Sequence, residues 1–170
     1  MATAAPTLPA SRPASGLWSW ITTVDHKRIG LLYLYTTFFF FLVGGTEALL
    51  IRTQLVWSNM KVLNADLYNQ IFTMHGTTMI FLFVIPILAG FGNYFVPLLI
   101  GARDMAFPKL NMLSYWLLIF GGLVLNSSFF LGGAPNAGWT GYAPLSTAAF
   151  SKGSAMDFWA LGLLLIGTSS

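Results

Sequence analysis

The sequence predicts an all-α integral membrane fold with three complete transmembrane helices and the first part of a fourth. Of its 170 residues, 56% are hydrophobic and only 8% are charged, whereas an ordinary globular domain carries roughly 25% charged residues. Several apolar runs reach the ~20 residues that a helix needs to cross a bilayer. Since lipid admits only helices and closed barrels, and these runs are too long for barrel strands, helices are expected.

The predicted helices follow one another in chain order. Residues 29–51 form the first span, which contains four consecutive phenylalanines from Phe38 to Phe41. Residues 69–100 and 112–131 form the second and third. A fourth apolar run begins near Asp157 and reaches Ser170, which is about 14 residues and too short for a span. Asp25 is expected to cap the first helix and Pro108 to occupy the first turn of the third.

The remaining segments are expected to lie outside the lipid. Residues 1–17 are rich in Ala, Pro and Ser and predict a disordered tail, so residues 18–170 form the transmembrane portion. Residues 132–146 predict a turn-rich outer loop, with Trp139 and Tyr142 near the lipid headgroups. The sequence shows no basic stripe with interleaved aromatic residues, so the bilayer is an expected partner and nucleic acid is not.

Cations indicate the orientation of the chain. The loops before the first predicted helix and after the second lie on one side of the membrane, and they carry the larger share of the positive charge. The positive-inside rule therefore predicts a cytoplasmic N-terminus in a multi-pass protein of the inner (plasma) membrane. The inner cations are Arg12, Lys27, Arg28, Arg103 and Lys109, and the outer cations are Arg52, Lys61 and Lys152.

His75 is an ionisable residue inside an apolar run, and such residues are candidates for function. Two interpretations stay open from its position: a hydrogen bond between helices, or a metal or haem ligand, because neutral imidazole is a common ligand. Arg52 also has two interpretations. It lies five residues after Glu47, at the end of the first span. Its side chain is either an interfacial charge that extends toward water or a group that holds a substituent of a cofactor.

Polar residues also gather where the second span ends and the third begins. Asn93 lies 18 residues after His75, which is five whole turns of a regular helix, and Pro86 between them is a candidate kink. Asp104 and Asn111 flank the inner loop. With Asn93 they form either a solvated loop with a capping amide or the mouth of a proton or ion path.

Five ordered strings carry a resemblance to a known family: "TTVDHKRIGLLYL", "LLIRTQL", "YNQIFTMHGTTMIF", "GFGNYFVPLLIGARDMAFPKLN" and "GGAPNAGWTGYAPL". Together they resemble the N-terminal part of subunit I of the haem-copper oxidases, the cytochrome c oxidase family, from about Trp18 to Ser170. The resemblance implies a fragment of a bundle of about twelve helices. It also implies a catalytic subunit of a proton-pumping terminal oxidase that reduces oxygen to water.

The resemblance assigns roles to individual residues. His75 matches the axial ligand of the low-spin haem, Arg52 the arginine that bonds the formyl group of haem A, and Trp139 a loop tryptophan near that haem. Asp104 matches the entrance of the D-type proton pathway. Asn93 and Asn111 match asparagines that line its first stretch.

The resemblance also implies what these residues lack. The second haem, the copper and their ligands are expected beyond Ser170, so no reacting group is assigned here and oxygen reduction by the fragment alone is not expected. His26 is a poor candidate for a metal ligand. Gln54 replaces a glutamate that many relatives associate with a bound ion, and Leu164 replaces a histidine of the fourth helix.

The implied partners are the rest of subunit I, oxidase subunits II and III, and cytochrome c as the electron donor. Two alternatives stay open. One is a fragment of a quinol oxidase subunit I, which these residues do not separate from a cytochrome c oxidase. The other is a non-catalytic helical membrane protein in which His75 and Asn93 only bridge helices.

Overall fold

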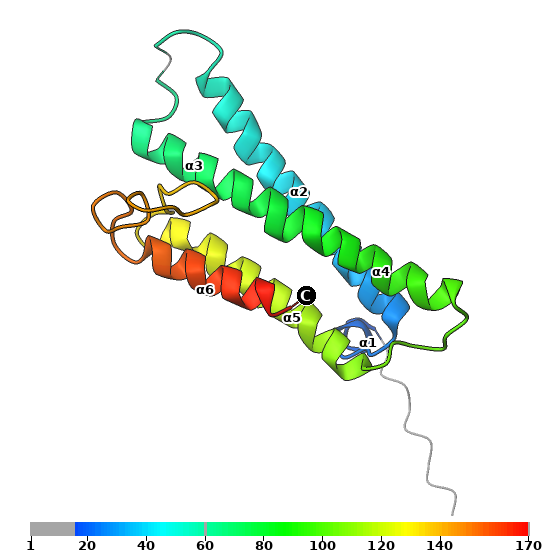
Figure 1. Cartoon of the computed structure of the whole chain (residues 1–170). Helices are drawn as coiled ribbons and strands as arrows, with labels where there is room; N and C mark the ends of the chain where they lie inside the picture. Colours follow the sequence, from blue (N-terminus) through cyan, green and yellow to red (C-terminus); the bar gives the residue numbers. More distant parts are fainter. Residues whose placement is uncertain (1–15, 60, 170) are drawn as a thin grey trace, which may run out of the picture.

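The computed structural model describes residues 16–59 and 61–169, and within them every regular element is helical. Residues 1–15 of the expected tail lie outside the described part; the first helix begins at Leu17. Figure 1 shows the elements in their spatial arrangement. In chain order they are α1 (Leu17–Ile21), α2 (His26–Gln54), α3 (Ala65–Thr77), the π-helical η1 (Thr78–Val84), α4 (Ile85–Leu99), α5 (Pro108–Ser127), the 3-10 turn η2 (Ser128–Phe130) and α6 (Ala155–Gly167).

Three helices are long and apolar enough to cross a membrane, as the sequence predicts. They are His26–Gln54 with 29 residues, Ala65–Leu99 with 35 and Pro108–Phe130 with 23. At ~1.5 Å per residue each exceeds the ~30 Å hydrocarbon core. Helix α6 has 13 residues, roughly 20 Å, so the described part of the chain has three long apolar helices and a shorter fourth, as the sequence predicts.

Local capping explains where the helices begin. The Asp25 side chain accepts a hydrogen bond of 2.9 Å from the Lys27 amide at the start of α2, as predicted. Pro108 occupies the first turn of α5, also as predicted. Helix α3 begins at Ala65 rather than near Asn69, because the Asn64 side chain accepts a bond of 2.7 Å from the Leu67 amide and satisfies a free donor.

The second span changes its winding before Pro86. Proline has no amide hydrogen, and its ring crowds the carbonyl of the residue four positions earlier. Here the seven residues Thr78–Val84 adopt a π-helix immediately before α4, with wider turns that absorb the disruption. The spacing between His75 and Asn93 therefore does not convert into five whole turns.

Glycines let the helices approach closely in two pairs. Helix α2 packs against α4 where a Cβ on Gly30 would lie 3.0 Å from the Gly90 carbonyl oxygen. Helix α5 lies beside α6 (Figure 1), where a Cβ on Gly121 would lie 2.9 Å from the Gly162 carbonyl oxygen. Small residues at such crossings are typical of membrane helices, whose association depends on close packing.

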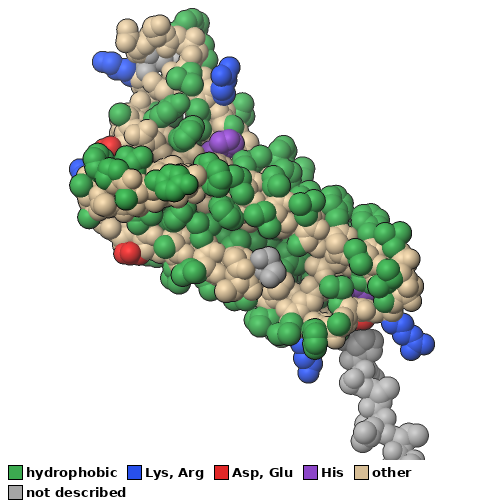
Figure 2. Space-filling view, in the orientation of Figure 1, with side chains coloured by type: hydrophobic (Ala, Val, Ile, Leu, Met, Phe, Trp, Pro, Cys, Tyr) green, Lys and Arg blue, Asp and Glu red, His purple; other side chains and the backbone are tan. Residues whose placement is uncertain are grey.

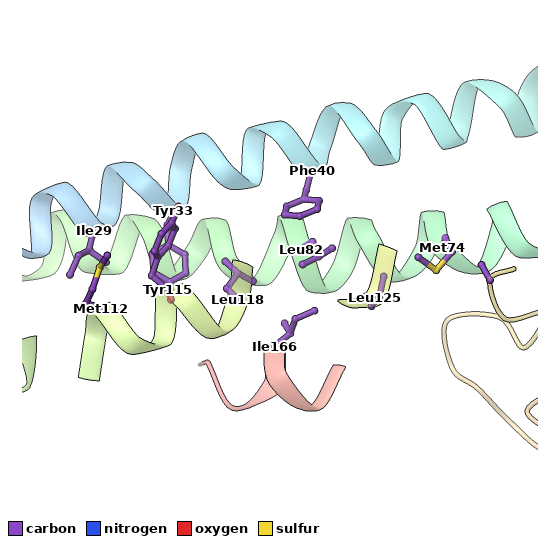
Figure 3. Close-up of a cluster of buried hydrophobic side chains, with 11 residues drawn as sticks. Ile29, Tyr33, Phe40, Met74, Leu82, Met112, Tyr115, Leu118, Leu125 and Ile166 are labelled. Atoms are coloured by element: carbon purple, nitrogen blue, oxygen red, sulfur yellow. The ribbon is translucent and has the colours of Figure 1, made fainter. Parts of the chain in front are cut away.

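The buried core lies between the two pairs. Figure 3 shows Phe40 of α2 above Leu82 of η1, and the rings of Tyr33 and Tyr115 have centroids 5.3 Å apart. Of the four consecutive phenylalanines only Phe40 is buried, because helical residues in a row point in different directions. Figure 2 shows Lys and Arg side chains toward the two ends of the molecule and hydrophobic side chains across its middle.

Candidate functional site

The His75 imidazole has a fixed hydrogen-bond partner on α2. Its Nδ1 lies 2.9 Å from the carbonyl oxygen of Gly44. A carbonyl oxygen only accepts, so Nδ1 must carry the proton. In the neutral ring Nε2 then has a free lone pair, and it makes no hydrogen bond within the described part of the chain. This arrangement is typical of a metal-bound histidine, whose second nitrogen donates to a carbonyl or a carboxylate.

Gly44 brings that carbonyl within reach because α2 and the second span cross closely there. A Cβ on Gly44 would lie 2.7 Å from the sulfur of Met79, closer than atoms pack. A larger residue would therefore displace Met79 or widen the crossing. The glycine thus contributes to the orientation of the His75 ring.

Trp139 reaches the same place from the outer loop. Its side chain packs on Gly76, where an added Cβ would lie 3.1 Å from the Trp139 Cβ. The rings of Trp139 and Phe81 have centroids 6.5 Å apart. The structure therefore places Trp139 on Gly76, the residue that follows His75 in the second span. Trp139 is nevertheless 44% exposed, and Tyr142 is 73% exposed.

Arg52 and Glu47 do not pair. The Arg52 side chain is exposed and forms no ion pair within the described residues. Glu47 is 7% exposed, and its Oε2 lacks a hydrogen-bond partner among them. Arg52 lies eight residues beyond Gly44, roughly 12 Å along the helix axis. Its guanidinium is open to an acceptor from outside the described chain.

Gln54 has a structural role in the α2–α3 connection. Its Oε1 accepts hydrogen bonds from the amides of Val62, at 3.0 Å, and Leu63, at 2.7 Å. An oxygen that faces two amide donors is not directed at a cation, which agrees with the weakened case for an ion site. Leu164 is an exposed residue of α6.

At the opposite end of the spans, Asp104 pairs with His26. The His26 Nδ1 lies 3.2 Å from the Asp104 Oδ1, which also accepts a bond of 2.8 Å from the Met105 amide. His26 is 1% exposed. Sequence reasoning set this histidine aside as a metal ligand and missed its contact with Asp104, because the two are far apart in the chain. Within the described residues Asp104 pairs with His26 and not with Arg103 or Lys109.

Asn93 and Asn111 lie at the same end, but no hydrogen bond joins them or Asp104 to one another within the described residues. The Asn93 Oδ1 and the Asn111 Nδ2 are buried without a partner there. Asn111 lines an open groove of about 430 Å³ that also includes Ser114 and Ser169. The three residues of the expected polar cluster therefore make no hydrogen bonds with one another in the described chain. Together with His26, we call them the inner polar group: His26, Asn93, Asp104 and Asn111.

Two hydrogen-bonded pairs between α2 and α5 extend from this end into the core. The Tyr33 hydroxyl lies 2.6 Å from the Ser114 hydroxyl, and the Thr36 hydroxyl lies 3.0 Å from that of Tyr115. Sequence reasoning missed them. The available signal was the helical spacing of Asn111, Ser114 and Tyr115 at positions i, i+3 and i+4, which places them on one face of α5.

The donors around His75 fit a haem rather than a protein-built metal cage. Within the described part of the chain there is no group of three or more His, Cys, Asp or Glu side chains that could hold an ion. A haem iron needs only axial ligands from the protein, and one imidazole supplies one of them. The oriented His75 ring is able to supply one such ligand, and Trp139 packs beside it on Gly76.

Fold and site together describe an all-helical, multi-pass membrane chain with an imidazole whose Nε2 is free. The family described as "Cytochrome C and Quinol oxidase polypeptide I" matches residues 28–170. The chain belongs to this family. The resemblance that the sequence strings carry is thereby confirmed.

Curated relatives have the same subunit name. The chain is similar to cytochrome c oxidase subunit 1 of Bacillus subtilis, with 57% identity over 90% of this chain and 24% of the relative. It is similar to the subunit of Bacillus sp. (strain PS3), with 56% identity over 89% and 24%, and to that of Synechocystis, with 47% identity over 100% and 30%. The chain thus spans 24% to 30% of the length of these relatives.

Proposed function

We propose that residues 18–170 form the N-terminal transmembrane portion of subunit I of a terminal oxidase, and that His75 ligates the low-spin haem through Nε2. The observation that carries the proposal is the bond of 2.9 Å between the His75 Nδ1 and the Gly44 carbonyl. It gives the ring one tautomer and one orientation, and it leaves the other nitrogen available. A haem bound there would supply one-electron transfer.

Other residues of this chain would hold and surround the haem. Arg52 is exposed at the end of α2, always charged, and able to donate to the formyl group of haem A. Trp139 would cover the outer side through its packing on Gly76. The second haem and the copper of the complete subunit take no ligands from the residues assigned here.

The inner polar group would admit protons. Asp104 accepts from His26 and from the Met105 amide, while Asn93 and Asn111 keep polar atoms without partners within the described residues. The Tyr33–Ser114 hydroxyl pair continues the polar route into the core. Asp104 would collect protons at the cytoplasmic surface, and the amides and hydroxyls would lead them inward.

The names of the relatives support one electron donor, and the cations of the chain support one location. They are named cytochrome c oxidase subunit 1, so we propose cytochrome c as the donor, subunits II and III as partners, and a proton-pumping enzyme. The described cations favour an N-terminus on the cytoplasmic side of the plasma membrane, since Lys27, Arg28, Arg103 and Lys109 share one end.

The test is His75→Ala in the complete oxidase, with the low-spin haem absorbance as the readout. Loss of that band, with the subunit still assembled, is the expected result. His26→Ala is the matched control and should keep the band, since His26 contacts Asp104 at the other end.

Added imidazole should partly restore the band in His75→Gly, because the free base fills the space of the deleted ring. An unchanged spectrum in His75→Ala would overturn the assignment. It would leave His75 as a bridge between helices, the role it has in the non-catalytic alternative.

A further inference from the structure

One surface of α3 holds the outer loop in place. Residues three or four positions apart on a helix share a face, and on α3 such residues contact the loop or α6. We call them the α3 contact face: Asp66, Gln70, Thr73, Gly76 and Thr77. At the outer end of this face, the side-chain nitrogen Nδ2 of Asn136 donates to the Asp66 carboxylate at 3.4 Å.

Gln70 and Thr73 bind the backbone of the loop. The Gln70 Oε1 accepts a bond of 3.1 Å from the Ala134 amide, and the Thr73 Oγ1 accepts one of 3.0 Å from the Gly138 amide. The Thr73 hydroxyl donates its own hydrogen to the Asn69 carbonyl at 2.8 Å. Because the hydroxyl hydrogen is already used in this bond, the oxygen can only accept from the loop. Gly138 has φ of +69°, a conformation that favours glycine.

Gly138, whose amide donates to the Thr73 hydroxyl, is the residue before Trp139. From there the indole extends onto Gly76, the residue that follows His75. Trp159 of α6 extends the contact face, since it donates to the Thr77 hydroxyl at 3.1 Å and packs against Gly141. The loop is therefore held on both sides of Trp139, and the position of this ring depends on polar groups of α3.

We propose that Thr73 and Gln70 are positioning residues that hold Trp139 on Gly76, the residue that follows His75. The proposal rests on the proposed function for its haem readout, while the contact itself is measured without the haem. Thr73 lies two residues before His75 but touches the loop, so its effect on the haem passes through Trp139.

The experiment compares Thr73→Val, Thr73→Ser and Thr46→Val in the complete oxidase. Valine retains the branched shape and removes the acceptor, and serine retains the hydroxyl. Thr46 is the control, because among the described residues its hydroxyl bonds only the Leu42 carbonyl of its own helix, at 2.8 Å. Three quantities are measured: the deuterium exchange of residues 132–141, the midpoint potential of the low-spin haem, and its absorbance.

Thr73→Val should raise the exchange rate of this segment roughly tenfold, on the scale of one lost hydrogen bond, and shift the potential. Serine and the control should change neither. In a Trp139→Phe background, Thr73→Val should add no further shift in the potential, because the side chain that it positions is gone.

Each failure has a separate meaning. Unchanged exchange in Thr73→Val would overturn the contact, whatever ligates the haem. Faster exchange with an unchanged potential and absorbance would overturn the positioning of Trp139. Gln70→Leu repeats the three measurements if Thr73→Val does not assemble, since Gln70 is only partly buried and its loss removes the Ala134 bond. Failure of the ligand itself is read from His75→Ala.

Discussion

The α3 contact face and the inner polar group lie toward opposite ends of the same spans and use polar side chains differently. On the α3 contact face, Gln70 and Thr73 each accept from a loop amide, and Thr77 accepts from Trp159. In the inner polar group only His26 and Asp104 are joined, and Asn93 and Asn111 keep buried atoms without partners in the described chain.

The difference indicates what each end can do. Groups that satisfy one another hold a fixed geometry, as a ligand and a covering ring require. Groups that keep free donors and acceptors can exchange hydrogen bonds, as the transfer of protons requires. Substitutions should therefore affect geometry at the α3 contact face and transport at the inner polar group.

The largest expected effect is at Asp104. Asp104→Asn in the complete oxidase should reduce turnover about 100-fold, within the range for loss of a proton-transfer group, because an amide at that position cannot take up and release a proton. The low-spin haem absorbance should not change, because Asp104 lies at the other end of the spans. Steady-state oxygen consumption and proton uptake measure this. Normal turnover and pumping would remove Asp104 from the pathway.

A steric test of the α3 contact face comes next. Gly76→Leu should destabilise the subunit by about 2 kcal/mol, as overpacking does, because Trp139 already lies 3.1 Å from an added Cβ. The matched control is Gly45→Leu, since no described residue lies within 4 Å of a Cβ there. Thermal unfolding in detergent compares the two. Equal stability would show that Trp139 is loosely held.

A smaller effect is expected at the α6 end of the contact face. Trp159→Phe removes the bond of 3.1 Å to the Thr77 hydroxyl and keeps a ring beside Gly141. The loss should be about 1 kcal/mol, the usual net contribution of a hydrogen bond. Thermal unfolding measures it, with exchange of residues 138–142 as a local readout. Loss of the haem band instead would mean that α6 has a direct role in the haem site.

The smallest effect on stability is expected for the inner pair. His26→Gln keeps a side chain that can donate a hydrogen bond to Asp104. The pair is part-buried, because the side chain of His26 is 2% exposed and that of Asp104 is 34% exposed, and a retained hydrogen bond limits the loss to less than about 1 kcal/mol. The unfolding temperature should shift little, while proton uptake slows. A large drop in stability would contradict this prediction. It would mean that the His26–Asp104 pair holds a fixed geometry, as the α3 contact face does.

Local chemistry allowed much of the fold to be predicted. Asp25 and Pro108 mark helix starts because their effects act within one turn. The three spans follow from apolar length, which the thickness of the bilayer sets. The sequence prediction missed the Asn64 cap, which extends α3 by a turn, because Asp66, Asn69 and Gln70 interrupt the apolar pattern after it.

His75, Arg52, Trp139, Asp104, Asn93 and Asn111 were visible in the chain as candidates, because polar groups in apolar runs and the ordered strings distinguish them. Their partners were not. The carbonyl of Gly44 faces His75 across 31 positions, and His26 meets Asp104 across 78. Composition and local pattern therefore settle which segments enter the bilayer. The tautomer of His75, the position of Trp139 and the pairing of Asp104 depend instead on how the helices cross. The reason is that packing, and not local spacing, sets the distances between residues remote in the chain.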